Sequence, residues 1–271
     1  MTNAYRITQQ VDSNENLVFS LDKYDTFGVL EVFSDKIDIE MLYNKLKIEH
    51  SLTDIIAKEV FNGKKSIVFG NCPERITVEE NDFKFIVNLK NEQDTGLPLD
   101  KSELRKLIKE YSNNKEVLDL FGYTGHLSIY ASASELNTVS IVEADSKFVQ
   151  KIKKNFEINS IDLPQIWDTN FWNFIEMAKE SRTKWDMILV DLSDYNLERL
   201  KDFDLQKDHT ELIKTLQNRL LKQSGTLIFT TNVKGFVLDQ YIRPGADKLT
   251  NQIATEAFKP LKNTQAFAFY N

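Results

Sequence analysis

The sequence contains a single cysteine, Cys72, so it cannot form an internal disulfide or a zinc site built from several thiolates. Its three histidines, His50, His126 and His209, are scattered and lack the spacing of metal ligands. We therefore expect neither a disulfide scaffold nor a zinc enzyme, and we expect no metal site.

The sequence also lacks long apolar runs and an excess of positive charge. The N-terminal Met-Thr-Asn-Ala-Tyr-Arg has no apolar signal region, and no stretch approaches the ~20 apolar residues that a membrane span needs. With 34 basic and 41 acidic residues the net charge is −7, which argues against nucleic-acid binding by overall charge but allows local basic patches. We expect a cytoplasmic protein with no membrane partner.

The chain has ample material for a folded core. Hydrophobic residues make up 41% of its 271 residues and include 18 Phe, 9 Tyr and 3 Trp, which excludes a low-complexity protein. This length suggests two domains. The best linker is Asn-Cys-Pro-Glu at 71–74, because Pro73 disfavours helix before it and stops the preceding strand. We therefore predict a small α+β domain at 1–74, with a possible role in RNA or substrate recognition, and a second domain at 75–271.

Within the first domain the apolar pattern predicts strands at 16–21, 27–33 and 66–69, with a helical pattern from Leu42 to Val60. The runs 75–79 and 83–89 are separated by Glu80-Asn81-Asp82 and predict a hairpin.

Strand-like and helical segments alternate from Val117 onward. Strands are predicted at 117–121, 139–143, 186–191, 225–230 and 266–270, with helices at 146–158 and 209–222 that Ser146 and Asp208 could cap. This alternation predicts an α/β fold with a doubly wound, Rossmann-like, mostly parallel sheet.

Acidic residues occur in or at the end of three predicted strands and in the turn before a helix, at the edge where open α/β sheets bind ligands. They are Asp119, Glu143, Asp168 and Asp191. Neither the Gly-x-Gly-x-x-Gly spacing nor a Walker lysine is present, which disfavours dinucleotides and nucleoside triphosphates. A cofactor with a ribose, an adenine amino group, a positive charge and no phosphate fits better, and S-adenosyl-L-methionine has these features.

Each acid has a possible partner on this cofactor. Asp119 could meet the ammonium directly or through water, Glu143 could accept the ribose hydroxyls, and Asp168 could accept the adenine amino group. Gly122 and Gly125 would let the backbone pass close to the methionine part. Any one acid at a strand end could instead cap a helix or face solvent, but four in strand order favour a site.

Three stretches carry a resemblance to a known family: Asp94-Thr-Gly-Leu-Pro-Leu-Asp100, Leu118-Asp-Leu-Phe-Gly-Tyr-Thr-Gly125, and Phe203-Asp-Leu-Gln-Lys-Asp-His209 followed by Thr231-Asn-Val-Lys-Gly-Phe236. The sequence resembles the class I S-adenosylmethionine-dependent ribosomal RNA methyltransferases. Within them it is most similar to the C-terminal guanine-N7 half of the bifunctional large-subunit methyltransferase K/L. The region with Tyr5-Arg6 and Asp22-Lys-Tyr24 resembles the domain that precedes the catalytic core.

The resemblance implies two sets of site residues. The cofactor would contact Asp100, Asp119, Phe121, Gly122, Tyr123, Thr124, Gly125, Glu143, Asp168 and Asp191, with Arg105 beside Asp100 at the entrance. Catalysis and base binding would involve Asp191, Tyr195, Asn232 and Lys234. In this interpretation Asp191 accepts hydrogen bonds and Tyr195 stacks on the base, while Asn232 and Lys234 hold the base edge or a phosphate. Tyr195 could equally be an ordinary packed aromatic, and Asp100 could cap a helix with Glu103 at its third position.

The sequence departs from the family where the substrate would bind. Asp191-Leu-Ser-Asp-Tyr195 replaces Asp-Pro-Pro-Thr-Phe and loses two prolines that stiffen the loop presented to a flipped base. Lys101-Ser102 replaces His-Arg, and Ser132-Ala-Ser-Glu135 replaces a glycine-rich turn. The cofactor motif is therefore better preserved than the substrate motif.

We expect an RNA methyltransferase acting on a base of large-subunit 23S ribosomal RNA, with guanine N7 as the target atom. This lone pair needs alignment with the methyl donor and no strong base. Cytosine-C5 transfer needs a cysteine nucleophile, and Cys72 lies in the linker. Two alternatives stay open: a degenerate relative that binds the cofactor or RNA without catalysis, and a methyltransferase redirected to protein or a small molecule. The lysines at 147, 151, 153 and 154 are interpreted as a solvated helix face, and the oligomeric state is left open.

Overall fold

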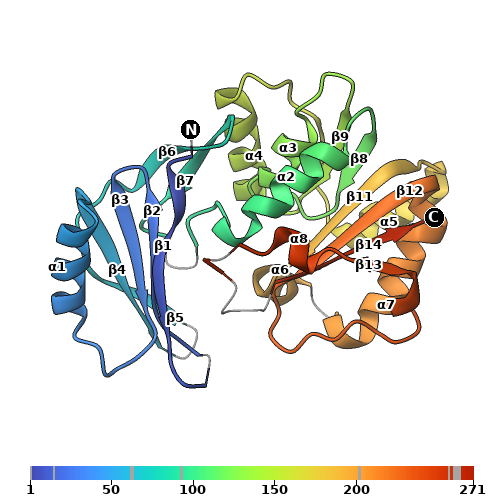
Figure 1. The fold of residues 1–271 in the computed structure, drawn as a ribbon. Coiled ribbons are helices and arrows are strands. Elements are labelled where there is room, and N and C mark those ends of the chain that lie inside the picture. Colours follow the sequence, from blue (N-terminus) through green and yellow to red (C-terminus); the bar gives the residue numbers. More distant parts are fainter. Residues whose placement is uncertain are drawn as a thin grey trace. The chain divides into compact units, whose positions relative to one another are not determined.

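The computed structural model of the protein describes residues 2–14, 16–61, 64–91, 94–200, 203–255, 257–258 and 264–271. The chain forms two compact units, Met1–Ser102 with Thr255–Leu261 and Glu103–Ala254 with Lys262–Asn271 (Figure 1). The division falls at Ser102 and not at the predicted residue 74.

The first unit is built on a five-stranded sheet with strand order β1-β2-β3-β4-β5. Its strands are β1 (Ala4–Val11), β2 (Leu17–Tyr24), β3 (Phe27–Val32), β4 (Asp54–Phe61) and β5 (Lys64–Phe69). Only β3 and β4 pair in parallel, because helix α1 (Ile39–Glu49) connects them. The core of this unit includes Leu21, Leu30, Leu46 and Ile55, so α1 packs on the sheet through Leu46.

The helical pattern predicted from Leu42 to Val60 is wrong in its second half. Helix α1 ends at Glu49, Ser51 adopts a left-handed backbone with φ of 51°, and β4 begins at Asp54. Consecutive residues at the start of β4 are fully buried, so its apolar run lacks the alternation of a half-exposed strand. A short buried run of this kind cannot be distinguished from helix by periodicity alone.

The predicted hairpin is present as β6 (Arg75–Glu80) and β7 (Phe83–Asn88), and it belongs to the first unit. The backbone N–H of Asn3 donates to the carbonyl of Glu79 at 2.9 Å, and the N–H of Asn81 donates to the Thr2 hydroxyl at 2.9 Å. The Asn-Cys-Pro-Glu segment is therefore an internal connection, and Cys72 within it is buried. The 3-10 turn η1 (Leu99–Lys101) completes this unit.

The second unit is the predicted doubly wound sheet. Its seven strands have the order β10-β9-β8-β11-β12-β14-β13. They are β8 (Glu116–Asp119), β9 (Thr138–Val142), β10 (Gln165–Trp167), β11 (Trp185–Leu192), β12 (Leu221–Thr231), β13 (Ala246–Lys248) and β14 (Gln265–Tyr270). The five strands from β10 to β12 are parallel, and β14 runs antiparallel to both of its neighbours.

Helices cover both faces of this sheet. Figure 1 shows α2 (Ser102–Tyr111), α3 (His126–Ala131) and α4 (Ser146–Ile158) grouped together, apart from α5 (Phe171–Ser181) and α7 (Leu205–Thr215). Buried residues of α5 and α7 join β8, β11 and β12 in one core cluster. The short helices α6 (Asp194–Arg199) and α8 (Thr250–Ile253) and the 3-10 turn Arg243–Gly245 lie in the connections.

Two helix boundaries differ from the prediction. The caps are Asp145 and Asp204, whose carboxylates accept from the N–H groups of Lys147 at 2.8 Å and Lys207 at 3.2 Å, instead of Ser146 and Asp208. The helix predicted at 209–222 is α7 followed by a π-helical segment, Leu216–Leu220, after which β12 begins at once.

Within the part of the chain that the structure describes, no helix has the length and apolar character of a membrane span. The same residues contain no group of three or more acidic, histidine or cysteine side chains that could hold a metal ion.

Candidate active site

The turn after β8 is shaped by two glycines. The N–H of Gly122 donates to the carbonyl of Val142 at 3.0 Å, and Gly125 adopts a left-handed backbone with φ of 80° before α3 begins. A Cβ on Gly122 would lie 2.3 Å from Cγ2 of Ile141 in β9, a distance that only a shift of the structure could relieve. Gly122 is therefore required by the close packing of this turn on β9.

Asp119 ends β8 and is fully buried. Its carboxylate accepts from the Ser128 hydroxyl at 2.6 Å and from the N–H of Phe121 at 3.3 Å. Burial raises the pKa of Asp119 to about 6, those two hydrogen bonds oppose the rise, and the charges of Asp191 and Glu143 add to it. Asp191 and Glu143 thus lie close enough to Asp119 to influence it, and the three acids make a region of negative charge that favours a cation.

Glu143 follows β9 and is also buried. One carboxylate oxygen accepts from the N–H of Tyr123 at 2.9 Å and the other from the N–H of Asp145 at 2.8 Å. These bonds fix the carboxylate against the turn after β8.

Asp191 is held by groups that the sequence did not single out. Its Oδ1 accepts from the hydroxyl of Thr230 at 3.4 Å, and Thr230 is its register partner on β12. Its main-chain carbonyl accepts from the side-chain amide of Asn196 at 2.7 Å. Strand β11 continues through Leu192, which is fully buried. Asn196 therefore restrains the segment where the family has two prolines.

The other predicted residues at the carboxyl edge are less enclosed. Asp168 directly follows β10 and is exposed. The main-chain carbonyl of the preceding Trp167 accepts from the N–H of Glu143 at 3.1 Å. Asn232 and Lys234 follow β12, and Lys234 is exposed. Among the described residues, Asn232 Oδ1 is a buried acceptor without a hydrogen-bond partner.

Parallel strands have their carboxyl ends at the same edge of a sheet. The second unit therefore places Asp119, Glu143, Asp168, Asp191, Asn232 and Lys234 along one edge. For Tyr195 on α6 the structure describes only the backbone, so its predicted stacking lies outside the described side chains. Asp100 lies in turn η1 of the first unit.

The predicted methionine-side residues contribute mainly through their backbone. Thr124 is fully buried, and its carbonyl accepts from the Asn155 side chain at 2.9 Å. The ring of Tyr123 is nearly buried and lies 4.6 Å from that of Phe148. Phe121 is half-buried. The Tyr123 ring and the Thr124 main-chain carbonyl therefore pack the turn against helix α4.

Arg105 and the histidines of the second unit have internal roles. Arg105, expected at an entrance, is fully buried, and its guanidinium lies 3.3 Å from Nδ1 of buried His126, which must accept. His209 donates from Nδ1 to the Leu205 carbonyl at 2.8 Å and accepts at Nε2 from the N–H of Asp239 at 3.0 Å. Both ring nitrogens of His209 are occupied, which leaves it unsuited to act as a general base.

Four residues that the sequence pattern did not indicate hold the acids and the turn after β8 in place: Ser128, Asn155, Asn196 and Thr230. Only Thr230 had a usable signal, because it ends a predicted strand beside the strand of Asp191. The others depend on helix positions that periodicity does not fix.

The chain is similar to proteins of known class. Residues 62–258 match the model of a family described as S-adenosylmethionine-dependent methyltransferase. Ribosomal RNA large subunit methyltransferase K/L of Alteromonas mediterranea is 34% identical over 172 residues, which cover 62% of this chain and 24% of the relative. The protein of the same name from Buchnera aphidicola is 25% identical over 97% of this chain and 40% of the relative. The chain thus spans about a quarter to two fifths of the length of these relatives.

Solved structures show the same fold. A SAM-dependent methyltransferase from Streptococcus mutans superposes with a TM-score of 0.79 at 19% identity, over 100% of this chain and 75% of that chain. A methyltransferase solved in complex with SAH superposes with a TM-score of 0.78 at 19% identity, over 100% of this chain and 76% of that chain. The sheet order, the acidic carboxyl edge and a family match over well over half of the chain lead to one conclusion: the chain belongs to the S-adenosylmethionine-dependent methyltransferase family.

Proposed function

We propose that this protein transfers a methyl group from S-adenosyl-L-methionine to a base of large-subunit ribosomal RNA, with guanine N7 as the target atom. The observation that carries the proposal is the cluster of Asp119, Glu143 and Asp191 at the carboxyl edge of the sheet, beside the glycine turn after β8. The names of the relatives support ribosomal RNA as the substrate.

The residues present fit this cofactor. Two backbone N–H groups fix the Glu143 carboxylate at the end of β9, and we assign it to the two ribose hydroxyls. Asp168 is exposed beside it and could accept the adenine amino group. Asp119 is fully buried, so we assign it a positioning role: it holds the turn through Phe121 and contributes negative charge near the cationic donor.

The bound cofactor supplies an electrophilic methyl group. The N7 lone pair of guanine would take up this methyl group as the S–CH₃ bond breaks, and the positive charge would pass from sulfur to the base. Alignment is the main requirement because no proton leaves the target atom. Asp191 can accept hydrogen bonds from the base, Asn232 offers a buried acceptor, and exposed Lys234 can approach a phosphate.

Calorimetric titration with S-adenosyl-L-methionine tests the cofactor site. We expect saturable binding that is lost in Glu143→Ala and retained in Glu135→Ala. Glu135 is an exposed glutamate between α3 and β9, at the opposite edge of the sheet, and so provides a matched control. Binding unaffected by Glu143→Ala would contradict the assignment.

Transfer of labelled methyl to undermodified ribosomal RNA tests the substrate. Alkaline ring opening and chain cleavage at the labelled nucleotide would identify a 7-methylguanine. Label found only on protein or small molecules would replace RNA by the redirected alternative, and cofactor binding without transfer would favour the non-catalytic relative. The non-catalytic alternative is suggested by the segment after Asp191, which lacks the two prolines of the family. There the Asn196 side chain donates to the main-chain carbonyl of Asp191 near the end of β11.

We further propose that the first unit helps to recognise the RNA. The supporting observation is the match to the Buchnera relative, which covers 97% of this chain and so includes this unit. Ultraviolet crosslinking of RNA to the whole protein, followed by peptide mapping, tests it: crosslinks confined to the second unit would contradict a recognition role.

A further inference from the structure

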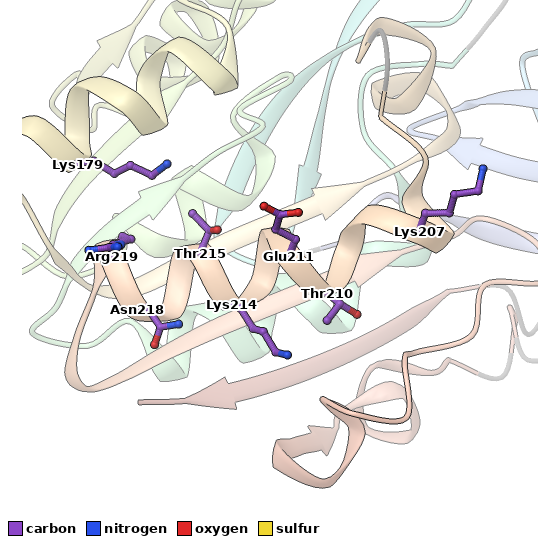
Figure 2. Close-up of a pocket in the computed structure, with 8 residues that line it drawn as sticks. All are labelled: Lys179, Lys207, Thr210, Glu211, Lys214, Thr215, Asn218 and Arg219. Carbon is purple, nitrogen blue, oxygen red and sulfur yellow. The ribbon is translucent and has the colours of Figure 1, made fainter.

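An open groove on the second unit, shown in Figure 2, is lined by residues of α7 and of the π-helical segment Leu216–Leu220, together with Lys179 of α5. Helices α5 and α7 follow parallel strands, so both begin at the carboxyl edge and run away from it. The groove is lined by four cations, Lys179, Lys207, Lys214 and Arg219, together with Glu211 and polar side chains.

Two of the four cations have no acidic partner within the described part of the chain. Lys179 pairs with Glu176 at 2.7 Å and Lys207 with Asp204 at 2.6 Å, but both pairs are solvent-exposed and therefore weak. Among the residues that the structure describes, Lys214 and Arg219 have no acidic group within ion-pair distance. The groove keeps an excess of positive charge in a chain whose net charge is −7.

An exposed aromatic ring lies on the same helix face as this groove. Trp172 is 46% exposed, and its ring centroid lies 4.3 Å from that of Phe171 and 6.1 Å from that of Phe203. Trp172 and Lys179 are seven residues apart on α5, a spacing that places them on one face. Phe203 precedes the first turn of α7. The aromatic residues therefore lie toward the carboxyl-edge end of the groove, beside the proposed site.

We propose that the α5–α7 groove binds a single-stranded segment of the RNA substrate, with phosphates on Lys214 and Arg219 and a base stacked on Trp172. Cations that follow a groove toward an exposed aromatic ring suit the alternating phosphates and bases of a single strand. An acidic peptide would use the cations but would gain little from the indole face. This inference rests on the proposed function.

Anisotropy of a fluorescent single-stranded RNA oligomer, titrated with the whole protein at several salt concentrations, measures the phosphate contacts. The slope of log K against log salt is negative, and for Lys214→Ala/Arg219→Ala we expect its magnitude to decrease by roughly 1.4, since each phosphate contact on a single strand contributes about 0.7. The control is Lys153→Ala/Lys154→Ala, which removes two exposed lysines of helix α4 and should leave the slope unchanged. Equal slopes in the groove variant and the wild type would overturn the inference.

Substitution of the indole ring measures the stacking. Trp172→Ala should bind the oligomer about tenfold more weakly, and Trp172→Phe should restore most of the affinity, because a ring of any aromatic residue can stack on a base. S-adenosyl-L-methionine binding in each variant shows whether the fold is intact. Unchanged RNA affinity in Trp172→Ala contradicts the base-stacking part.

Two results separate this inference from the proposed function. If the wild type methylates RNA and the groove variants bind RNA as the wild type does, the groove is wrong and the function stands. If the folded wild type binds S-adenosyl-L-methionine but neither binds nor methylates RNA, both fail. Capture of an acidic peptide in place of RNA, lost in the groove variant, would reassign the groove to a protein partner.

Discussion

The buried carboxylate of Asp119 predicts a stability that depends on pH. Its pKa is raised from an ordinary value of 3.8 to about 6, chiefly because burial disfavours the charged form. At pH 8 the folded protein must hold this carboxylate ionised, which costs about 3 kcal/mol relative to the unfolded chain. Because the folded-state pKa lies above the unfolded-state pKa, stability is highest below pH 4 as far as this group is concerned. The contribution of Asp119 to stability is then lost as the pH rises through 6.

Asp119→Asn removes the charge and nearly preserves the shape. The amide oxygen can still accept from the N–H of Phe121, and the amide nitrogen can donate to the oxygen of Ser128. We expect the variant to exceed the wild type in free energy of unfolding by up to about 3 kcal/mol at pH 8, and by little near pH 4. We also expect weaker binding of S-adenosyl-L-methionine, because the negative charge near its cationic part is lost.

Urea unfolding followed by tryptophan fluorescence measures this difference. All three tryptophans, Trp167, Trp172 and Trp185, lie in the second unit, so their signal reports on the unit that contains Asp119 even if the two units unfold separately. Asp162→Asn, at an exposed aspartate, is the control. A gap between wild type and Asp119→Asn that is the same at pH 4.5 and pH 8 would refute the reasoning.

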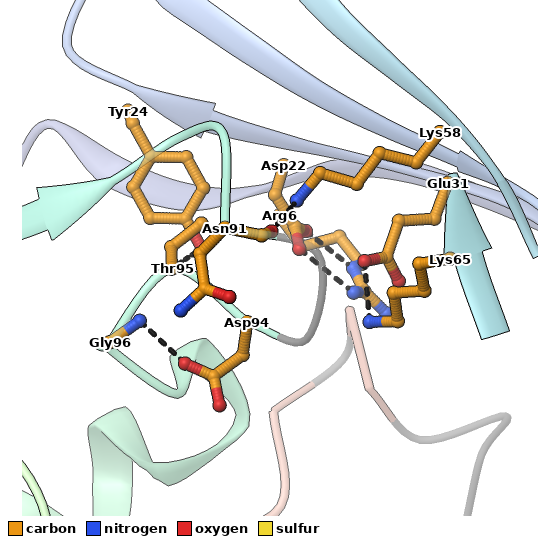
Figure 3. A network of polar contacts seen from close by, with 10 residues as sticks. All are labelled: Arg6, Asp22, Tyr24, Glu31, Lys58, Lys65, Asn91, Asp94, Thr95 and Gly96. Atoms are coloured by element: carbon orange, nitrogen blue, oxygen red, sulfur yellow. Dashed lines mark hydrogen bonds and ion pairs between the residues drawn. The ribbon is translucent and has the colours of Figure 1, made fainter. Parts of the chain in front are cut away.

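Three further predictions follow from the packing. Gly122→Ala should destabilise the second unit by about 1–3 kcal/mol and abolish cofactor binding, since its Cβ would lie 2.3 Å from a β9 side chain; Gly245→Ala, with nothing within 4 Å, should do neither in thermal-shift and calorimetric assays. The Arg6 guanidinium donates to the Asp22 carboxylate at 2.7 and 3.0 Å within the network of Figure 3. Arg6→Met should destabilise the first unit by about 3–5 kcal/mol because it leaves the Asp22 carboxylate buried without its cation. In denaturant unfolding the double variant Arg6→Met/Asp22→Leu should be more stable than Arg6→Met. Asn196→Ala should destabilise by about 1–2 kcal/mol and reduce methyl transfer more than cofactor affinity, because it frees the carbonyl at the end of β11; equal losses in both assays would contradict a role in substrate binding.

The sequence pattern predicted strands and helices correctly where buried positions recur at a regular spacing along the chain. The alternation of short β runs and amphipathic helices after Val117 predicted the parallel sheet correctly, because strand and helix periods differ. The same reasoning failed from Ile55 to Val60, where the apolar residues of a buried strand have a spacing that also fits a helix. It also placed the domain boundary before the β6–β7 hairpin, but the proline-containing segment there is a connection within the first unit.

The sequence by itself determined the succession of strands and helices, the acids at the strand ends and the glycines of the turn after β8. These features depend on neighbours within a few residues. Only the tertiary structure decided which groups hold those acids: the Ser128 hydroxyl on Asp119, the Thr230 hydroxyl on Asp191 and the burial of Arg105 against His126. It also decided that Lys179 of α5 lines one groove together with the cations of α7 and of the π-helical segment after it. Such contacts join residues far apart along the chain, and periodicity within any one segment carries no record of which segment will pack against it.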